Sequence, residues 1–200
     1  MGHTTVKARA EHLDEVQGSR FLAVATPVAS VEEAAALLDE QRAAHPDASH
    51  HVWAYRVGTA QRFSDDGEPG GTAGRPVLEV ILKRELDFVA VVVVRYFGGR
   101  KLGAGGLARA YGAAAARALD AAGEQVVVDL TRLRITASFA DADVVLRTLD
   151  AVAGLDRGEA GYDAAGLVLE VTLPETDATA LADRLREVTR GAVRIEPHRP

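Results

Sequence analysis

Seven consecutive apolar residues near the middle of the chain constrain its fold more than any other feature. The run Phe88-Val-Ala-Val-Val-Val-Val94 shows no alternation between apolar and polar positions. A strand with one face in water alternates, whereas a strand covered on both faces is apolar throughout. The run is also far shorter than the roughly 20 residues that span a bilayer as a helix. It therefore predicts a central strand buried on both faces, in a fold of the mixed α/β class.

The rest of the first half carries both strand and helix patterns. Ser30 and Glu33 form a capping box, a pattern that satisfies free backbone N–H groups at the start of a helix. A helix is therefore expected to begin there and to end near residue 44. The other elements expected in this half are a strand at 20–28, a strand at 50–57, a long loop at 58–75, a helix from Pro76 and a helix from Ala104 to about residue 122.

The second half predicts a β-α-β-β-α-β order, which is the ferredoxin-like arrangement. We therefore expect two domains, a first at 1–125 and a ferredoxin-like second at 131–200, with the boundary near residues 124–130. The elements expected in the second half are strands at 131–139, 156–163, 166–173 and 192–196, a helix at 141–153 and a helix from Thr176 or Asp177.

The composition excludes several classes of protein. The chain has 200 residues, a net charge of −6 and no cysteine, which excludes disulfides, thiolate metal sites and cysteine nucleophiles. Its first residues carry no apolar stretch of the secretory type, and we expect a cytoplasmic protein with no membrane partner. Mild acidity argues against a surface that is basic throughout, but it is compatible with one local basic patch.

A local reversal of charge marks the best candidate for a binding surface. From residue 88 to residue 119 there is no Asp or Glu, while Arg and Lys lie among glycines. A glycine-rich turn that opens a helix presents free N–H groups to an anion, and nearby cations strengthen such a site. Tyr96 adds a ring on which a base can stack. The residues expected to bind nucleic acid or phosphate are Arg75, Arg95, Tyr96, Gly98, Gly99, Arg100, Lys101, Gly103, Gly105, Gly106 and Arg109.

The acidic turn that precedes the second helix is another candidate site. Asp65, Asp66 and Glu68, together with His51, could hold a divalent cation or act as general acid and base. Asp-Gly and Glu-Pro-Gly-Gly are also ordinary turn sequences, so these carboxylates can instead shape the turn or pair with the arginines, and the glycines can serve close packing. We predict no cofactor and no metal. The dinucleotide fingerprint at residues 103–108 lacks the β-α-β unit that it requires.

Two long motifs in this region are similar to those of a known family. The first is Phe63-Ser-Asp-Asp-Gly-Glu-Pro-Gly-Gly-Thr-Ala-Gly-Arg-Pro76, and the second is Arg95-Tyr-Phe-Gly-Gly-Arg-Lys-Leu-Gly103 followed by Gly105-Gly-Leu-Ala-Arg-Ala-Tyr111. They resemble the IMPACT family, whose bacterial members are called YigZ-like proteins, over residues 18 to about 122. The resemblance implies a first domain like domain 2 of ribosomal protein S5 and a ferredoxin-like second domain. It also implies a role in translational control, in which eukaryotic members bind a regulator of a stress kinase.

These observations favour a non-enzymatic, translation-associated regulator that binds RNA, the ribosome or a protein partner through its basic glycine-rich surface. One alternative is a metal-dependent hydrolase or phosphoryl-transfer enzyme that acts on a phosphorylated small molecule. Its metal would bind to the turn formed by Asp65, Asp66 and Glu68. Another alternative is a protein-interaction adaptor, whose partner binding would resist nuclease treatment.

Overall fold

The computed structural model describes residues 2–198, which form two compact units. The N-terminal unit comprises His3–Val127, and the C-terminal unit comprises the described residues from Val128 onward together with Gly2. Each unit has its own buried core, and each combines helices with strands, so the predicted mixed α/β class is confirmed. No helix within residues 2–198 has both the length and the apolarity that are needed to cross a bilayer.

The N-terminal unit is built on a five-stranded antiparallel sheet. The strand order is β2-β3-β6-β4-β5, so β6 is the central strand. Residues 89–95 of β6 are all buried, which confirms the prediction of a strand covered on both faces. The five strands are β2 (Ala10–Val16), β3 (Ser19–Pro27), β4 (His50–Val57), β5 (Ala60–Ser64) and β6 (Val89–Tyr96).

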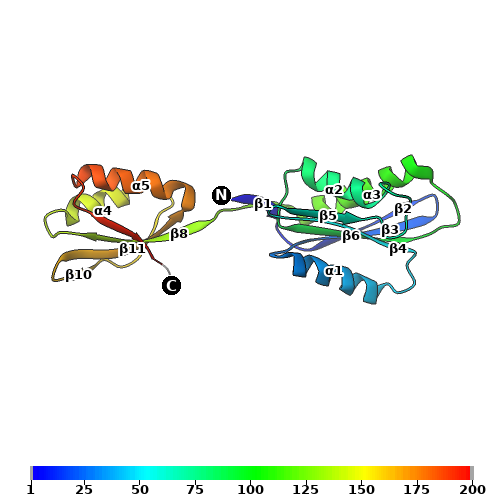
Figure 1. The fold of residues 1–200 in the computed structure, drawn as a ribbon, viewed down its shortest axis with the longest axis horizontal. Coiled ribbons are helices and arrows are strands. Elements are labelled where there is room, and N and C mark those ends of the chain that lie inside the picture. The colour runs from blue at the N-terminus through cyan, green and yellow to red at the C-terminus, as the bar shows by residue number, and fades with distance from the viewer. Residues whose placement is uncertain (1, 199–200) are drawn as a thin grey trace. The chain divides into compact units, whose positions relative to one another are not determined.

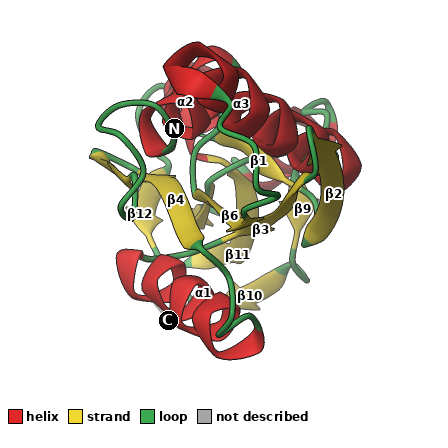
Figure 2. Ribbon diagram, turned by 90° about the vertical axis from the view of Figure 1, so that its right-hand side faces the viewer, coloured by secondary structure: helices red, strands yellow, loops and turns green. Residues whose placement is uncertain are grey.

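Helices cover both faces of this sheet (Figures 1 and 2). α2 (Gly74–Lys83) and α3 (Gly103–Ala122) pack on one face, and α1 (Val31–Ala44) packs on the other. Alternate residues of β6 accordingly belong to two different cores. The odd-numbered positions from 89 to 93 join the core beneath α2 and α3, and the even-numbered positions from 90 to 94 join the core beside α1.

The local sequence explains where α1 begins. The Ser30 hydroxyl accepts a hydrogen bond from the Glu33 N–H at 3.3 Å, as the capping box predicts. The Glu33 carboxylate accepts one from the Ala29 N–H at 2.7 Å, one residue before the partner that a capping box ordinarily uses. Both bonds satisfy backbone donors next to the first turn, and the predicted limits of this helix are confirmed.

Four strands of the N-terminal unit were not predicted, namely β1 (His3–Val6), β2, β5 and β7 (Glu124–Val127). The expectation of a loop throughout 58–75 is wrong in its first part, because β5 forms a hairpin with β4 there. β1 and β7 form a separate two-stranded sheet. β2 and β5 are edge strands in which no residue is fully buried. The apolar alternation that reveals a strand is therefore missing from them.

The C-terminal unit follows the predicted β-α-β-β-α-β order, with the second strand split into two short pieces. Its antiparallel sheet has the order β10-β11-β8-β12, and β9 also pairs with β11. Both helices lie on one face of this sheet (Figure 1). The elements are β8 (Leu130–Ala137), α4 (Ala142–Asp150), β9 (Asp156–Arg157), β10 (Gly161–Asp163), β11 (Gly166–Pro174), α5 (Glu175–Val188) and β12 (Arg194–Pro197).

Candidate nucleic-acid interface

The first carboxylate of the acidic turn is used to build the turn. The two carboxylate oxygens of Asp65 accept hydrogen bonds from the N–H groups of Gly71 at 2.8 Å, Ala73 at 3.0 Å and Gly74 at 2.8 Å. Gly74 is the first residue of α2. Asp65, which lies outside this helix, therefore caps its N-terminus. A negative charge at this position also interacts favourably with the helix dipole.

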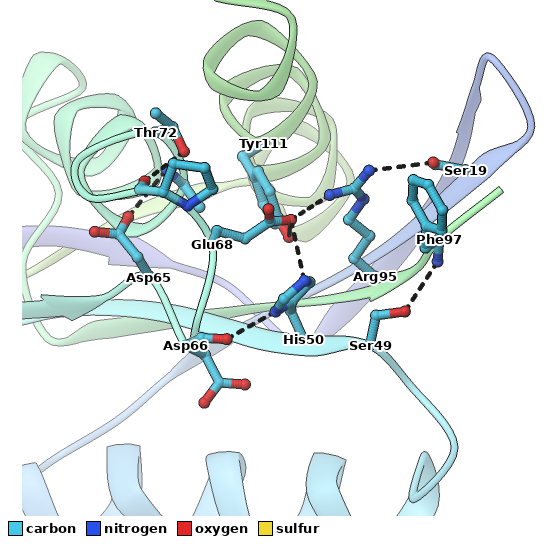
Figure 3. Close-up of polar contacts among 12 residues, drawn as sticks. Ser19, Ser49, His50, Asp65, Asp66, Glu68, Thr72, Arg95, Phe97 and Tyr111 are labelled. Carbon is cyan, nitrogen blue, oxygen red and sulfur yellow. Dashed lines mark hydrogen bonds and ion pairs between the residues drawn. The ribbon is translucent and has the colours of Figure 1, made fainter. Parts of the chain in front are cut away.

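The second carboxylate fastens the turn to the start of β4. Asp66 has a φ of +44°, and its Oδ2 accepts a hydrogen bond from the His51 N–H at 2.6 Å. The His51 ring is buried, with its Nε2 3.1 Å from the carbonyl oxygen of His45. His50, the neighbour on the opposite face of the strand, is the histidine that lies near Glu68 (Figure 3).

The third carboxylate lies at the centre of a buried polar cluster (Figure 3). Oε1 of Glu68 accepts hydrogen bonds from Arg95 Nη1 at 2.5 Å and from the Tyr111 hydroxyl at 2.8 Å, and His50 Nε2 lies 3.8 Å away. The Glu68 and Arg95 side chains are only 4% and 5% exposed. Burial, followed by the hydrogen bond to Glu68, raises the pKa of Tyr111 far above its usual value. Its hydroxyl therefore remains a donor to the carboxylate.

All three carboxylates of the acidic turn have partners within the protein. Within residues 2–198, no three or more His, Cys, Asp and Glu side chains are placed so that they could hold a metal ion. Asp65 binds backbone N–H groups, and the charge of Glu68 is paired with that of Arg95. In the structure these carboxylates shape the turn and pair with an arginine.

The structure buries Arg95 inside the protein, whereas the other predicted cations are exposed. Position 95 has the same parity as the residues of β6 that face α2 and α3, so its side chain enters that side. Its Nη2 lies 3.3 Å from the Ser19 hydroxyl, and its guanidinium lies 5.4 Å from the centre of the Phe21 ring. Tyr96 points the opposite way, and its hydroxyl is 2.8 Å from Nδ1 of His45. Arg95 is therefore buried, and Tyr96 is half-buried.

Gly98 permits a close contact between two turns. A Cβ at this position would lie 2.0 Å from the carbonyl carbon of Gly18, a separation that no side chain can adopt. The Gly98 N–H donates to the Ser19 hydroxyl at 3.1 Å. Gly99 and Gly103, in contrast, have φ values of +83° and +70° and open space around them. Between these two glycines, Arg100 and Lys101 are exposed, whereas Leu102 packs against the core beneath α2 and α3.

Three cations surround the start of α3. Arg100 and Lys101 are exposed and directly precede the helix, and the exposed Arg109 extends back along it, because its Nη1 would lie only 3.5 Å from a Cβ at Gly105. None of the three makes an ion pair with a residue that the structure describes. No side chain caps α3, and its first turn has no acidic residue. We call this region the glycine-loop surface; it consists of Arg100, Lys101, Arg109, Gly99, Gly103, Gly105 and Gly106.

Arg75 lies outside the glycine-loop surface. It lies on α2 and pairs with Glu79 at 3.3 Å, one helical turn further along. Conversely, the sequence analysis did not identify Tyr111 and Ser19 as partners of the acidic turn and of Arg95. Tyr111 belongs to the second motif, but no local pattern indicates that its hydroxyl meets a carboxylate from residue 68.

The sheet, the acidic turn and the glycine loop together define a known domain class. Residues 17–119 match the model of the Impact N-terminal domain family. The chain belongs to the IMPACT family, as its two motifs suggested. It is 44% identical over 182 residues to the IMPACT family member in the pol 5′ region of Thermus thermophilus, covering 90% of this chain and 99% of the relative.

Two further comparisons extend over nearly the whole chain. IMPACT family member YigZ of Escherichia coli (strain K12) is 34% identical over 191 residues, which cover 92% of this chain and 91% of the relative. A crystal structure of a hypothetical protein superposes with a TM-score of 0.66 at 30% identity, covering 99% of this chain and 98% of its own. Both units of the fold are therefore shared with relatives.

Proposed function

We propose that the N-terminal unit binds the phosphate backbone of RNA through the glycine-loop surface, and that the protein is a non-enzymatic regulator associated with translation. One observation carries the proposal: three exposed cations without ion pairs lie around a helix start that no side chain caps. In a chain of net charge −6 this surface is locally basic. Such a local field attracts a polyanion although the whole protein is acidic.

The chemistry of the surface suits phosphate. Arg100 and Arg109 each offer a planar fork of donors that matches phosphate oxygens, and Lys101 adds a point charge. The unpaired N–H groups in the first turn of α3 add donors and the positive end of the helix dipole. These contacts read no base, so the binding that they support is independent of sequence. Ribosomal RNA and free RNA both offer such a phosphate backbone. We therefore also propose a cytoplasmic location for the protein.

The other two hypotheses receive less support. A metal-dependent hydrolase needs free carboxylates, and those of the acidic turn are engaged in structural contacts. A protein-interaction adaptor would not require three neighbouring cations without acidic partners. We also propose that the two units are separately folded domains, with the second orienting the first on its target.

Co-sedimentation with ribosomes and with free RNA across a salt series tests the proposal. We expect salt-sensitive binding that is reduced in the triple variant Arg100→Ala, Lys101→Ala and Arg109→Ala. Each lost contact with a single-stranded phosphate lowers the slope of log affinity against log salt by about 0.7, so the triple variant should lose about 2 units. Arg95 stays in place, because removing it would disturb the core.

A matched control separates a local surface from overall charge. Lys7→Ala, Arg62→Ala and Lys83→Ala together remove the same charge from other exposed positions of the N-terminal unit. They should leave the slope almost unchanged. Equal losses in the two triple variants, or no binding of RNA and ribosomes at low salt, would refute the proposal. Ribosome binding that survives nuclease digestion of exposed RNA would instead favour a protein partner.

A further inference from the structure

A pocket of about 360 Å³ opens beside the glycine-loop surface. Its volume lies at the small end of the range for small-molecule sites. The apolar part of its wall comes from Pro69 in the acidic turn, Phe97 after β6, and Leu102 and Leu107 around the start of α3. Lys101 of the glycine-loop surface also lines it, so a phosphate bound at that surface lies next to the mouth.

The polar part of the pocket contains groups whose hydrogen bonds are incomplete. Every contact that the Glu68 side chain makes with described residues uses Oε1, which leaves Oε2 without a partner although the side chain is only 4% exposed. Arg95, 4% exposed, lines the same pocket, and its Nε has no hydrogen-bond partner. Buried polar groups are ordinarily satisfied. The orphaned Nε of Arg95, beside a carboxylate oxygen that no described residue contacts, therefore points to a ligand.

His50 completes the polar edge of the pocket. Its Nδ1 lies 2.8 Å from the carbonyl oxygen of Asp66. Since a carbonyl can only accept, Nδ1 carries the proton, and in the neutral ring Nε2 offers a lone pair. Nε2 is also the atom that lies 3.8 Å from Glu68. The pocket thus presents the Oε2 acceptor of Glu68 and the Nε–H donor of Arg95 to a group that brings both an N–H donor and an acceptor.

Phe97 supplies the surface for a flat ring. It is 50% exposed, and the Arg95 guanidinium lies 5.5 Å from its ring centre. An exposed aromatic ring beside a phosphate-binding surface is the arrangement that stacks bases of single-stranded nucleic acid. The ligand that fits these walls is planar, bears an N–H donor and an acceptor at one edge and carries an anionic group close by.

We propose that this pocket takes one unstacked nucleobase with an exocyclic amino group, from an RNA strand held by the glycine-loop surface. The base stacks on Phe97, and its amino group donates to Oε2 of Glu68. Adenine and cytosine have such a group, whereas uracil has a carbonyl in its place, which would face the carboxylate. This inference rests on the proposed function, to which it adds a preference among bases.

Fluorescence anisotropy of the full chain with the labelled hexanucleotides A6, C6 and U6 tests it. We expect A6 and C6 to bind more tightly than U6. Phe97→Ala should weaken binding of A6 about tenfold with an unchanged salt slope, because stacking and not phosphate contact is lost. Phe97→Trp should retain it. Phe63→Ala, which removes a 41% exposed phenylalanine from a different pocket, is the matched control and should change affinity less than twofold.

The outcomes separate this proposal from the function on which it rests. Salt-dependent binding that is equal for the three oligomers and unaffected by Phe97→Ala overturns the base pocket and leaves RNA binding intact. A second arm measures thermal stabilisation by AMP and UMP. Stabilisation by AMP that Phe97→Ala abolishes, in a protein that binds no hexanucleotide, supports the pocket, identifies a free nucleotide as its source and refutes the RNA strand. No binding in either arm refutes both proposals.

Discussion

The acidic turn at residues 65–74 and the basic turn at residues 98–106 are both rich in glycine, but they differ in what their charged groups contact. In the acidic turn, Asp65 binds backbone N–H groups and Glu68 binds a buried arginine. In the basic turn, Arg100 and Lys101 make no ion pair with described residues and stay exposed. The charged groups of the first turn therefore stabilise the fold, whereas the cations of the second turn remain exposed to solvent.

The largest effect is expected where the buried pair is broken. Glu68→Gln keeps the shape of the side chain but leaves the Arg95 charge without its partner, which should lower the free energy of unfolding by about 3–5 kcal/mol. Urea denaturation measures this. Glu79→Gln, in the exposed pair with Arg75, should cost less than about 1 kcal/mol. Similar losses in the two variants would remove the distinction between the turns.

A smaller but still large effect is expected at Gly98. Alanine there would place its Cβ 2.0 Å from Gly18, so the two turns must separate, at about 3 kcal/mol. Gly99→Ala meets no atom within 4 Å and should cost only about 1–2 kcal/mol for its left-handed backbone. Thermal unfolding of both variants tests the order. A Gly99 variant that is less stable than the Gly98 variant would contradict the close contact.

Tyr111 should link stability to alkaline pH. Its pKa is raised in the folded protein, so its contribution is complete below the pKa of an unfolded tyrosine, about 10, and is lost as the pH rises further. At neutral pH, Tyr111→Phe removes a donor to a carboxylate and should cost about 1.5–3 kcal/mol. In the variant, the free energy of unfolding should also fall less steeply above pH 10 than in the parent protein. Tyr162→Phe, at a 58% exposed position, is the control and should keep the decline.

The smallest effect on stability is expected at the glycine-loop surface. Replacing Arg100, Lys101 and Arg109 by alanine breaks no ion pair with a described residue, so each change should alter the free energy of unfolding by less than about 0.5 kcal/mol. The same variant should lose RNA binding. A large loss of stability would mean that these cations belong to the fold, like Arg95, and would end the contrast between the two turns.

Much of the fold followed from local patterns in the sequence. The uninterrupted apolar run revealed a strand covered on both faces, and Ser30 with Glu33 located the start of α1. Edge strands such as β5 were not predicted, because a strand without buried residues needs no apolar alternation. Pairing between distant segments, as in β1 and β7, left no signal in either segment alone.

The candidate site could be predicted only where its residues lie close together in the sequence. Arg100, Lys101 and Arg109 lie close together in sequence and remain together in the structure. Arg95 belonged to the same stretch, but the parity of its strand turns it inward, where groups from residues 68 and 111 meet it. The hydrogen bonds of Glu68 with Arg95 and with Tyr111 span 27 and 43 positions of sequence separation. No pattern within a single element could have predicted them.

The β1–β7 pairing also has a mechanical consequence. His3 lies opposite Val127, and Val6 lies opposite Glu124, so the chain enters and leaves the N-terminal unit at the same end of this strand pair. A force that pulls on both ends would therefore separate the pair like a zipper, with hydrogen bonds breaking one after another rather than together. The first step of forced unfolding is then expected at low force. The five-stranded sheet would bear the load only after the β1–β7 pair has separated.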